Sequence, residues 1–491
     1  MKFSRFEVMI QYILNSKLTR IAITVLFTLI SCAYVLILTR QFYLGFNPDS
    51  VEYFDLAFSI ANGDGFVDKQ GNFVNHWPPF YSLIVAFISL ISSSEIQQSG
   101  IYLSAICSGL IFLLFNQLQT ILELQNNLIR LALNSILFLI LLPKTMLSFL
   151  SEGLFIVFTL LFVRFLLQWF ATESKLQLVF ASIVLGLMFI TRYAALGFAL
   201  ALGATVIHKW LKNKNYYQLV HNGLLAIIPF ALKVAPWLIF STIKAENATN
   251  RVLEFHPVGF DSLVEFGKVV VDWLVPNGYF VMYAAVIGGV ASILIFIVLK
   301  FRGLHNLGGL IVLSYCIGSY LFLLIISMSF FDAATTFDHR ILSPILPLGL
   351  LMLGIICRIN QVIIPIGTLL LFSVIKNVPP FLKQSLGFYN QGLGYTSVWW
   401  RDSETLMNID ELNIPTDTIY LNNYYALRLY KPELIQVVKG LHKLGNNLGS
   451  NSSVVVLTTH SDVELDADSI WNRIGRQGEL CKFSDGFIIK P

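Results

Sequence analysis

The sequence predicts an all-α polytopic membrane protein with about eleven transmembrane helices, followed by a small extracytoplasmic α/β domain. Three observations lead to this fold class. Hydrophobic residues make up 56% of the 491-residue chain and charged residues only 13%, about half the charged fraction of a typical soluble protein. Apolar runs of membrane-crossing length recur along most of the chain. After residue 377 these runs give way to polar sequence.

The first apolar run, residues 21–38, follows a basic segment that contains Lys2, Arg5, Lys17 and Arg20. It has neither the short core nor the small-residue cleavage site of a signal peptide. Because basic flanks remain in the cytoplasm, we expect an uncleaved first span that starts on the cytoplasmic side.

Ten further apolar runs are predicted to cross the membrane. They cover residues 101–121, 131–150, 153–171, 177–191, 194–210, 219–241, 279–299, 307–330, 343–357 and 361–376. The connectors that this count places in the cytoplasm are basic and contain Arg130, Lys175, Lys209, Lys212, Lys214, Lys300, Arg302 and Arg358. This bias supports the count, and an odd number of spans places the C-terminal part outside the cytoplasm.

One apolar run is interpreted differently. Residues 79–91 are too few to cross a bilayer, which takes about 20 residues. Counting them as a span would also move the basic connectors to the other side. We therefore expect a juxtamembrane helix in the outer interface. Residues 41–98 then form one long extracytoplasmic loop, and residues 242–278 form a further outer loop.

Composition divides the chain into a transmembrane domain, residues 1–377, and a small domain, residues 378–491. The second part is polar and contains short runs typical of strands at residues 418–421, 454–459 and 487–489, with a helical stretch near residues 424–447. We expect a small α/β domain on the outer face.

Composition also excludes two kinds of function. The net charge is only +4, and no stretch combines Lys and Arg with aromatic residues as a nucleic-acid surface would, so no nucleic-acid partner is expected. The five cysteines form no Cys-x-x-Cys pair, which favours packing over thiol chemistry.

The first outer loop holds the first candidate functional residue. Pro48 suits the start of a helix, and Asp49 or Ser50 could cap its first turn. An apolar stripe that can lie on the membrane follows, formed by Val51, Phe54, Ala57 and Phe58. Asp49 is then held at the membrane edge, either as a plain helix cap or as a reactive carboxylate.

The order of residues around Asp49 resembles a known family. Asp49 and Tyr53 are followed by Ala57, by Gly63-Asp64-Gly65 and by Trp77-Pro78-Pro79-Phe80-Tyr81. This pattern, directly after a first span, is similar to that of the GT-C class of membrane glycosyltransferases, in the branch of protein O-mannosyltransferases and aminoarabinose transferases. Many members carry a second acidic residue where this chain has Ser50.

Further matches follow in the order of the family and cover roughly residues 20–360. They are Ser151-Glu152, Gly186-Leu187, Thr191-Arg192-Tyr193, Ala235-Pro236-Trp237, and Asp338-His339-Arg340 with Pro344 and Pro347. The family's frequent Arg-Asn is replaced by Phe240-Ser241.

The resemblance implies an enzyme that takes a sugar from a polyprenyl-phosphate carrier at the outer membrane face. Asp49 would activate the acceptor and Glu152 would be the second catalytic acid. The donor phosphate would bind Arg340, His339, Arg192 and Lys233, and the substrate loop would present Tyr53, His76 and Trp77. No cofactor is firmly implied, and a divalent metal held by Asp49 and Glu152 is left open.

The residues themselves point the same way. Ionisable groups near membrane spans are costly, and they are usually partnered or functional. The expected topology places Asp49, His76, Glu152, Arg192, His339 and Arg340 at one interface. Cationic side chains there could stabilise a leaving phosphate, and a carboxylate could take the acceptor's proton. One carboxylate without a covalent intermediate implies inversion. The competing interpretation is that Glu152, Arg192 and Arg340 are helix-end or snorkelling charges.

Two other function classes stay open. A transporter or flippase of lipid-linked sugars would need charged or broken helices at the bilayer midplane, whereas here the charges collect at one surface. A membrane-anchored scaffold gives no reason for that shared side. The expected partners are a polyprenyl-phosphate sugar and an acceptor glycan, lipid or protein. The expected location is the bacterial inner membrane, with a cytoplasmic N-terminus.

Overall fold

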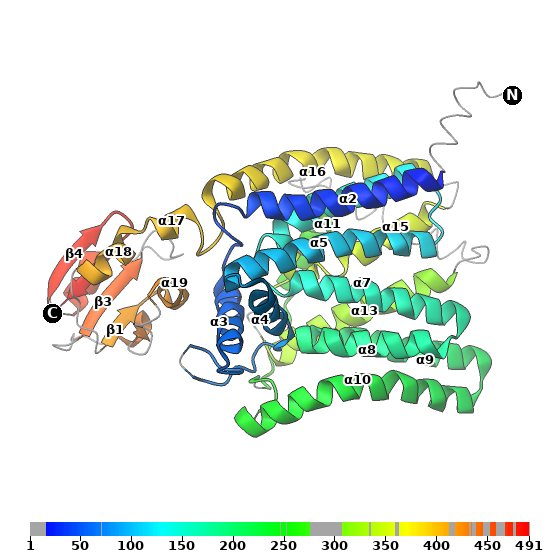
Figure 1. Cartoon of the computed structure of the whole chain (residues 1–491), viewed down its shortest axis with the longest axis horizontal. Helices are drawn as coiled ribbons and strands as arrows, with labels where there is room; N and C mark the ends of the chain where they lie inside the picture. Colours follow the sequence, from blue (N-terminus) through cyan, green and yellow to red (C-terminus); the bar gives the residue numbers. More distant parts are fainter. Residues whose placement is uncertain are drawn as a thin grey trace.

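The chain folds into a bundle of long helices with a small β-sheet beyond one end of it (Figure 1). The computed structural model describes residues 16–69, 71–245, 247–251, 253–274, 307–332, 335–358, 363–411, 418–431, 434, 438–444, 452–457, 467–474 and 478–490.

Eight of the described helices are long and apolar enough to cross a membrane. They are α2 (Lys17–Leu38), α5 (Ile96–Ile121), α6 (Asn127–Leu141) with the π-helical turn η1 (Leu142–Met146), α7 (Glu152–Thr172), α9 (Leu196–Asn213) with the 3-10 turn η2 (Tyr193–Ala195), α10 (Tyr216–Ala245), α13 (Leu307–Phe330) and α16 (Ile363–Gln391). The prediction of a polytopic membrane protein is therefore confirmed.

Two shorter apolar helices occupy the positions of predicted spans. α8 (Lys175–Thr191) packs against α7 and α10, and α15 (Leu346–Ile356) packs against α6 and α13. With the eight long helices they account for ten of the eleven predicted spans. The remaining one, residues 279–299, lies outside the described residues.

Two of the predicted spans end at other positions than expected. The run 131–150 stops being helical at Met146, after a π-helical turn that contains Pro143, and the chain then extends before α7. The run 361–376 is only the first part of α16, which continues through Pro379 and Pro380 to Gln391. The division expected between residues 377 and 378 therefore falls inside one continuous helix.

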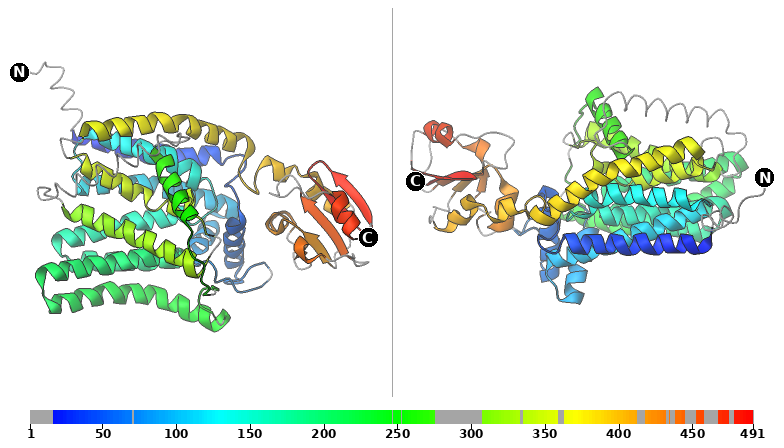
Figure 2. Two further views of the ribbon diagram at one scale, coloured as in Figure 1. Left: turned by 180° about the vertical axis from the view of Figure 1, so that it is seen from behind. Right: turned by 90° about the horizontal axis from the view of Figure 1, so that it is seen from above.

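Short helices cover the end of the bundle that faces the sheet, which we call the sheet end. α3 (Pro48–Asn62) and α4 (Phe80–Ser92) pack on each other and lie across the ends of the long helices (Figure 1). α4 has only 13 residues, so the run 79–91 is not a long span, as expected. α14 (His339–Leu342) lies at the same end, and α11 (Phe260–Leu274) lies at the edge of the bundle (Figure 2).

Among the described residues, the basic connectors gather at the opposite end of the bundle (Figure 1), whereas the connector with Lys300 and Arg302 lies outside the described residues. There the Lys209 Nζ lies 2.9 Å from Glu173 Oε1, and the Arg358 Nη2 lies 3.1 Å from Glu123 Oε2. The helices thus present Lys- and Arg-bearing turns at one end and the short helices at the other.

The C-terminal sheet has the strand order β2-β1-β3-β5-β4. Its strands are β1 (Thr418–Leu421), β2 (Val438–Gly440), β3 (Ser452–Leu457), β4 (Glu479–Phe483) and β5 (Gly486–Lys490). β1 is parallel to β2 and β3, whereas β5 is antiparallel to β3 and β4. The three predicted strands are present, and β2 and β4 were not predicted.

Helices flank this sheet on both faces, as an α/β domain requires. They are α17 (Val398–Arg401), α18 (Glu404–Glu411), α19 (Tyr424–Tyr430) and α20 (Ala467–Arg473), with the 3-10 turn η5 (Leu441–Lys443). Val455 packs with Leu427 of α19 on one face, and its neighbour Val456 packs with Ile470 of α20 on the other. Of the helix predicted near 424–447, the described residues form α19 only up to Tyr430, and the prediction is wrong at Val438–Gly440, which form β2.

Three extended segments tie the sheet end together. Gly45 donates its backbone N–H to Leu147 O at 2.8 Å and accepts from Phe149 N at 2.9 Å. Tyr395 donates its backbone N–H to Phe46 O at 2.8 Å. The neighbouring Gly394 has φ +59°, and a Cβ there would lie 1.9 Å from Phe46 O, so the close approach requires glycine. The chain before α3 is therefore held between the start of α7 and the linker to the sheet.

Candidate active site

Asp49 lies in the first turn of α3 and is free of a capping role. The cap is Asn47, whose Oδ1 accepts hydrogen bonds from Ser50 N and Ser50 Oγ, both at 2.9 Å. The expectation that Asp49 or Ser50 caps this helix is therefore wrong. Since Asn47 satisfies the first turn, the Asp49 carboxylate is available to other groups.

Glu152 starts α7 and is almost completely buried, with 1% of its side chain exposed. Its neighbour Ser151 is held by Tyr53, because the two hydroxyl oxygens are 2.8 Å apart. The Tyr53 ring packs edge-on against Tyr81. The backbone hydrogen bonds that Gly45 makes with Leu147 and Phe149 place Ser151 and Glu152 beside Asn47 and Asp49.

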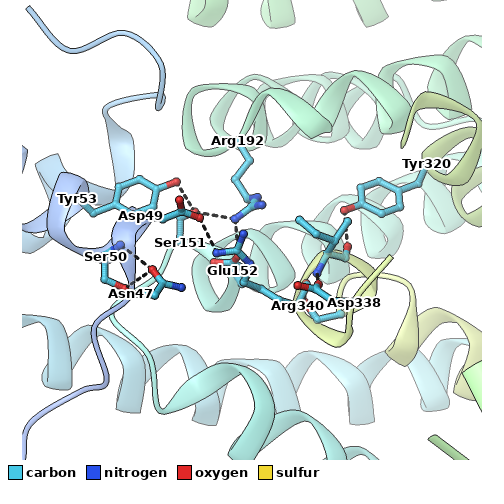
Figure 3. Close-up of polar contacts among 12 residues, drawn as sticks. Asn47, Asp49, Ser50, Tyr53, Ser151, Glu152, Arg192, Tyr320, Asp338 and Arg340 are labelled. Atoms are coloured by element: carbon cyan, nitrogen blue, oxygen red, sulfur yellow. Dashed lines mark hydrogen bonds and ion pairs between the residues drawn. The ribbon is translucent and has the colours of Figure 1, made fainter. Parts of the chain in front are cut away.

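Two arginines join the two carboxylates (Figure 3). The Arg340 Nη1 lies 2.5 Å from Asp49 Oδ2, and its Nε lies 3.4 Å from Glu152 Oε1. The Arg192 Nη1 lies 2.7 Å from the same Glu152 oxygen and donates to Ser151 Oγ at 3.2 Å. Four residues that are up to 291 positions apart thus form one charged cluster.

Local structure aims both arginines into this cluster. Arg192 follows the last residue of α8, in extended backbone. Arg340 belongs to the short helix α14, whose cap Asp338 accepts from Ile341 N at 2.6 Å. The Tyr320 hydroxyl of α13 donates to Ile341 O at 2.8 Å, which ties α14 to a long helix.

A cavity of about 460 Å³ opens beside the charged cluster. One wall is polar and contains Asp49, His76, Arg192, Asp338 and Arg340. Apolar side chains that line it come from α13 and include Leu323, Leu324 and Ile326. Such a cavity can hold a molecule that is charged at one end and hydrocarbon at the other.

The loop before α4 supplies another part of the wall. His76 and Trp77 both line the cavity, and their rings pack edge-on with centroids 4.6 Å apart. Burial lowers the pKa of His76, and the nearby Arg251 lowers it further. The same loop is anchored by Tyr193, whose hydroxyl donates to Asn75 O at 3.0 Å, and Trp237 Nε1 donates to that hydroxyl at 3.1 Å.

Some of the predicted site residues lie elsewhere. Tyr53 and Glu152 are buried behind the cavity wall and do not line it. Lys233 is exposed on α10, packs its stem along Gly186 of α8 and does not line the cavity either. His339 joins a separate cluster with Lys144, Asp272 and Trp273.

The two carboxylates do not suit a divalent metal. Asp49 and Glu152 already face the guanidinium groups of Arg340 and Arg192, and two cations beside the carboxylates disfavour a third. Throughout the described ranges, no three His, Cys, Asp or Glu side chains converge as metal ligands would.

The small domain contributes a residue that the sequence analysis missed. Arg428 of α19 is 3% exposed; its Nε lies 2.5 Å from Asp55 Oδ2 and its Nη1 lies 2.8 Å from Glu52 Oε1. Both carboxylates belong to α3, one and two turns beyond Asp49. Lys69 adds a contact to Asp55 at 3.3 Å. The domain is thereby fastened to the helix that carries Asp49.

Some missed residues had a signal in the sequence and others had none. Lys144 is an isolated cation inside a predicted span, a pattern that indicates function or a partner. Arg428 and Asp55 lie in polar, amphipathic stretches where charge is unremarkable. Only the fold brings those two together.

The helical bundle, the short helices that cover one end and the small terminal domain form the kind of fold that the sequence predicts, and known structures share this fold. The chain superposes on the crystal structure of ArnT from Cupriavidus metallidurans bound to undecaprenyl phosphate, with a TM-score of 0.58 and 11% identity, covering 95% of this chain and 97% of that one. The apo crystal structure of the same ArnT gives a TM-score of 0.59 and 10% identity over the same shares. No protein-family model matches the sequence, and neither does any curated protein.

Proposed function

We propose that this protein is an inverting glycosyltransferase that moves a sugar from a polyprenyl-phosphate carrier to a hydroxyl group of an acceptor. The proposal is carried by one observation: Asp49 and the arginine pair Arg192 and Arg340 converge on the polar wall of a single amphipathic cavity. The fold supports it, since the ArnT structure of the same fold is described as bound to undecaprenyl phosphate.

The reaction assigns a role to each group. The acceptor oxygen attacks the anomeric carbon and gives its proton to Asp49, while the bond between that carbon and the phosphate oxygen breaks. The phosphate leaves with the bonding electrons, and Arg340 and Arg192 stabilise the charge it gains. General-base help of this kind contributes roughly 10²–10⁴-fold to a rate.

The resting contacts suggest how the base is released. Arg340 is paired with Asp49, and its side chain is 27% exposed at the cavity. A donor phosphate competes for that guanidinium, so its arrival frees the Asp49 carboxylate for the acceptor. Glu152 does not line the cavity, and its role is to hold both arginines in place.

The cavity walls match the two parts of the donor. The apolar wall from α13 suits the isoprenoid chain near the phosphate, and the polar wall suits the sugar and its phosphate. His76 and Trp77 contribute an aromatic edge against which a sugar ring can pack. The acceptor in this proposal is a hydroxyl group of a glycan, a lipid or a protein.

The charge distribution supports an extracytoplasmic site. The described basic connectors lie at the end of the bundle opposite α3, whose Asp49 lines the cavity, and such connectors stay in the cytoplasm. The site and the small domain then face outward, and the N-terminus faces inward, in a bacterial inner membrane.

One experiment separates this proposal from its alternative, a flippase of lipid-linked sugars. Purified protein in liposomes is given a polyprenyl-phosphate sugar that is radiolabelled in the sugar, together with candidate acceptor glycans and lipids. A transferase produces labelled acceptor and free polyprenyl phosphate, with the anomeric configuration inverted. Label that changes leaflet but stays on the carrier would refute transfer and support the flippase.

A further inference from the structure

A second charged cluster lies next to the cavity but does not line it. The Lys144 Nζ is 2.7 Å from Asp272 Oδ2 and 2.8 Å from His339 Nε2. His339 Nε2 is itself 3.1 Å from the same Asp272 oxygen. His339 and Arg340 are neighbours in α14. Arg340 belongs to the charged cluster at the cavity, and His339 belongs to the second cluster.

The hydrogen-bond pattern shows that two donors share one acceptor. Trp273 Nε1 donates to His339 Nδ1 at 3.0 Å, and an indole nitrogen can only donate. His339 therefore carries its proton on Nε2, which points at Asp272 Oδ2. Lys144 also donates there, so two donor groups stand 2.8 Å apart around a single carboxylate oxygen.

Asp272 responds to these donors. Although burial opposes it, the hydrogen bonds from His339 and Lys144 hold the pKa of Asp272 well below its usual range. The three side chains remain between one fifth and one third exposed, with 20% for Lys144, 25% for Asp272 and 29% for His339. An anion from outside can therefore reach the two donors.

The helix that carries Asp272 has an amphipathic pattern. α11 carries Asp272 near its end, and its first turns expose the apolar side chains Phe260, Leu263 and Val264 at helical spacing. A helix of this pattern lies in the membrane interface. The same helix is fixed to a long one, since Asn377 of α16 donates to Trp273 O at 3.1 Å.

We propose that Lys144 and His339 form a second phosphate site, which holds the phosphate of the spent polyprenyl carrier as it leaves the cavity, and that Asp272 occupies the two donors while the site is empty. The proposal rests on the proposed glycosyl transfer. Transfer converts a singly charged phosphodiester into a phosphate monoester, which carries more negative charge. The Lys144 ammonium and the neutral Nε2–H donor of His339 lie beside Arg340, and together they suit that product better than the sugar-bearing phosphodiester.

The test measures binding of polyprenyl phosphate to the full chain in nanodiscs of zwitterionic lipid, with Lys144→Met and Asp272→Asn beside the wild type. Lys144→Met is expected to weaken binding about tenfold, because it removes one charge-assisted hydrogen bond. Asp272→Asn is expected to strengthen binding several-fold, because it removes the competing anion. Lys268→Met is the matched control: it removes an exposed lysine of α11 and should leave affinity unchanged.

The opposite changes in affinity that are expected for Lys144→Met and Asp272→Asn distinguish a phosphate site from a structural ion pair. If both variants weaken binding alike, or if Lys144→Met behaves like Lys268→Met, the second site is refuted. Inorganic phosphate that competes as well as the lipid does would refute the carrier as the occupant. Binding needs no turnover, so Lys144-dependent binding without sugar transfer would sink the proposed function and leave this site standing.

Discussion

Glu152 is the buried carboxylate on which both arginines of the cavity depend. One of its oxygens faces Arg192 at 2.7 Å and Arg340 at 3.4 Å, and the side chain is 1% exposed. Removing a buried partner leaves uncompensated charge, which costs about 3–5 kcal/mol. A substitution of Glu152 is therefore expected to change both the stability of the protein and the rate of the reaction. Kinetic constants separate the effect on the reaction from the loss of stability.

We predict that Glu152→Gln lowers kcat at least tenfold while the KM for the lipid-linked donor stays the same or falls. The arginines lose their fixed orientation, which slows the reaction, but they also lose a competing negative charge, which favours phosphate binding. Initial rates over a range of donor concentrations give both constants. Glu123→Gln is the control, because it breaks an exposed pair with Arg358 at the other end of the bundle. A rise in the donor KM without a change in kcat would contradict the role given to Glu152.

His76 makes the stability of this region depend on pH. Its pKa is lowered in the folded protein, first by burial and then by Arg251, from a usual value of 6.5. Just below that value the unfolded chain binds more protons than the folded one, so stability is lost as the pH falls through this window. We expect the melting temperature of the wild type to drop between about pH 7 and about pH 5, and that of His76→Gln to drop less. Parallel melting curves for the two proteins would contradict this assignment.

At the scale of single elements, α3 is held from two sides. The chain just before α3 is fixed by the backbone hydrogen bonds that join Gly45 to Leu147 and Phe149. The middle of α3 is fixed by Arg428 of α19. Burial raises the pKa of Glu52 and of Asp55, although the positive charge of Arg428 opposes the rise. The small domain therefore supplies the cation that holds the face of α3 formed by Glu52 and Asp55.

Arg428→Met is predicted to lower kcat several-fold without a matching change in donor KM, since α3 carries Asp49 but does not itself hold the donor phosphate. The variant should also lose about 3 kcal/mol of stability. That loss should be larger at pH 8 than at pH 6, because carboxyls with a raised pKa resist ionisation inside the protein. Melting curves and kinetics at both pH values test this.

Two further variants sharpen the Arg428 experiment. Arg428→Lys keeps the charge and is expected to recover part of kcat, whereas adding Asp55→Asn to Arg428→Met should recover stability by removing one of the two carboxylates that have lost their arginine. Lys482→Met is the control in the same domain, where an exposed pair with Asp468 is lost. If Arg428→Met has wild-type kinetics, the small domain does not position the site.

At the scale of the whole molecule, hydropathy predicts the bundle well because each span is a local property. Within the described ranges, the Lys- and Arg-bearing connectors share one end of the bundle (Figure 1), and the run 79–91 is a short helix, as expected from its length. The distribution of basic connectors also predicts that the cavity lies at the opposite end of the bundle. The sequence also brings Asp49, Glu152, Arg192 and Arg340 to one end of the bundle, although not to particular contacts.

The contacts themselves depend on distant parts of the chain. Arg428 pairs with Asp55 across 373 positions, and Lys144 pairs with Asp272 across 128, distances over which a single sequence carries no pairing signal. The role of Asn47 as cap and the exclusion of Lys233 from the cavity are likewise set by three-dimensional packing. Local patterns therefore predict the elements and which connectors share an end of the bundle, and tertiary structure decides which charges meet.

The central claim is that Asp49 accepts the acceptor's proton during sugar transfer. The most direct measurement compares single-turnover transfer by the wild type and by Asp49→Asn, with the same labelled donor and with donor affinity measured separately. We predict a rate at least about a hundredfold lower for Asp49→Asn, with donor affinity unchanged or higher because Arg340 loses its resting partner. Transfer at the wild-type rate by a folded Asp49→Asn protein would contradict the account.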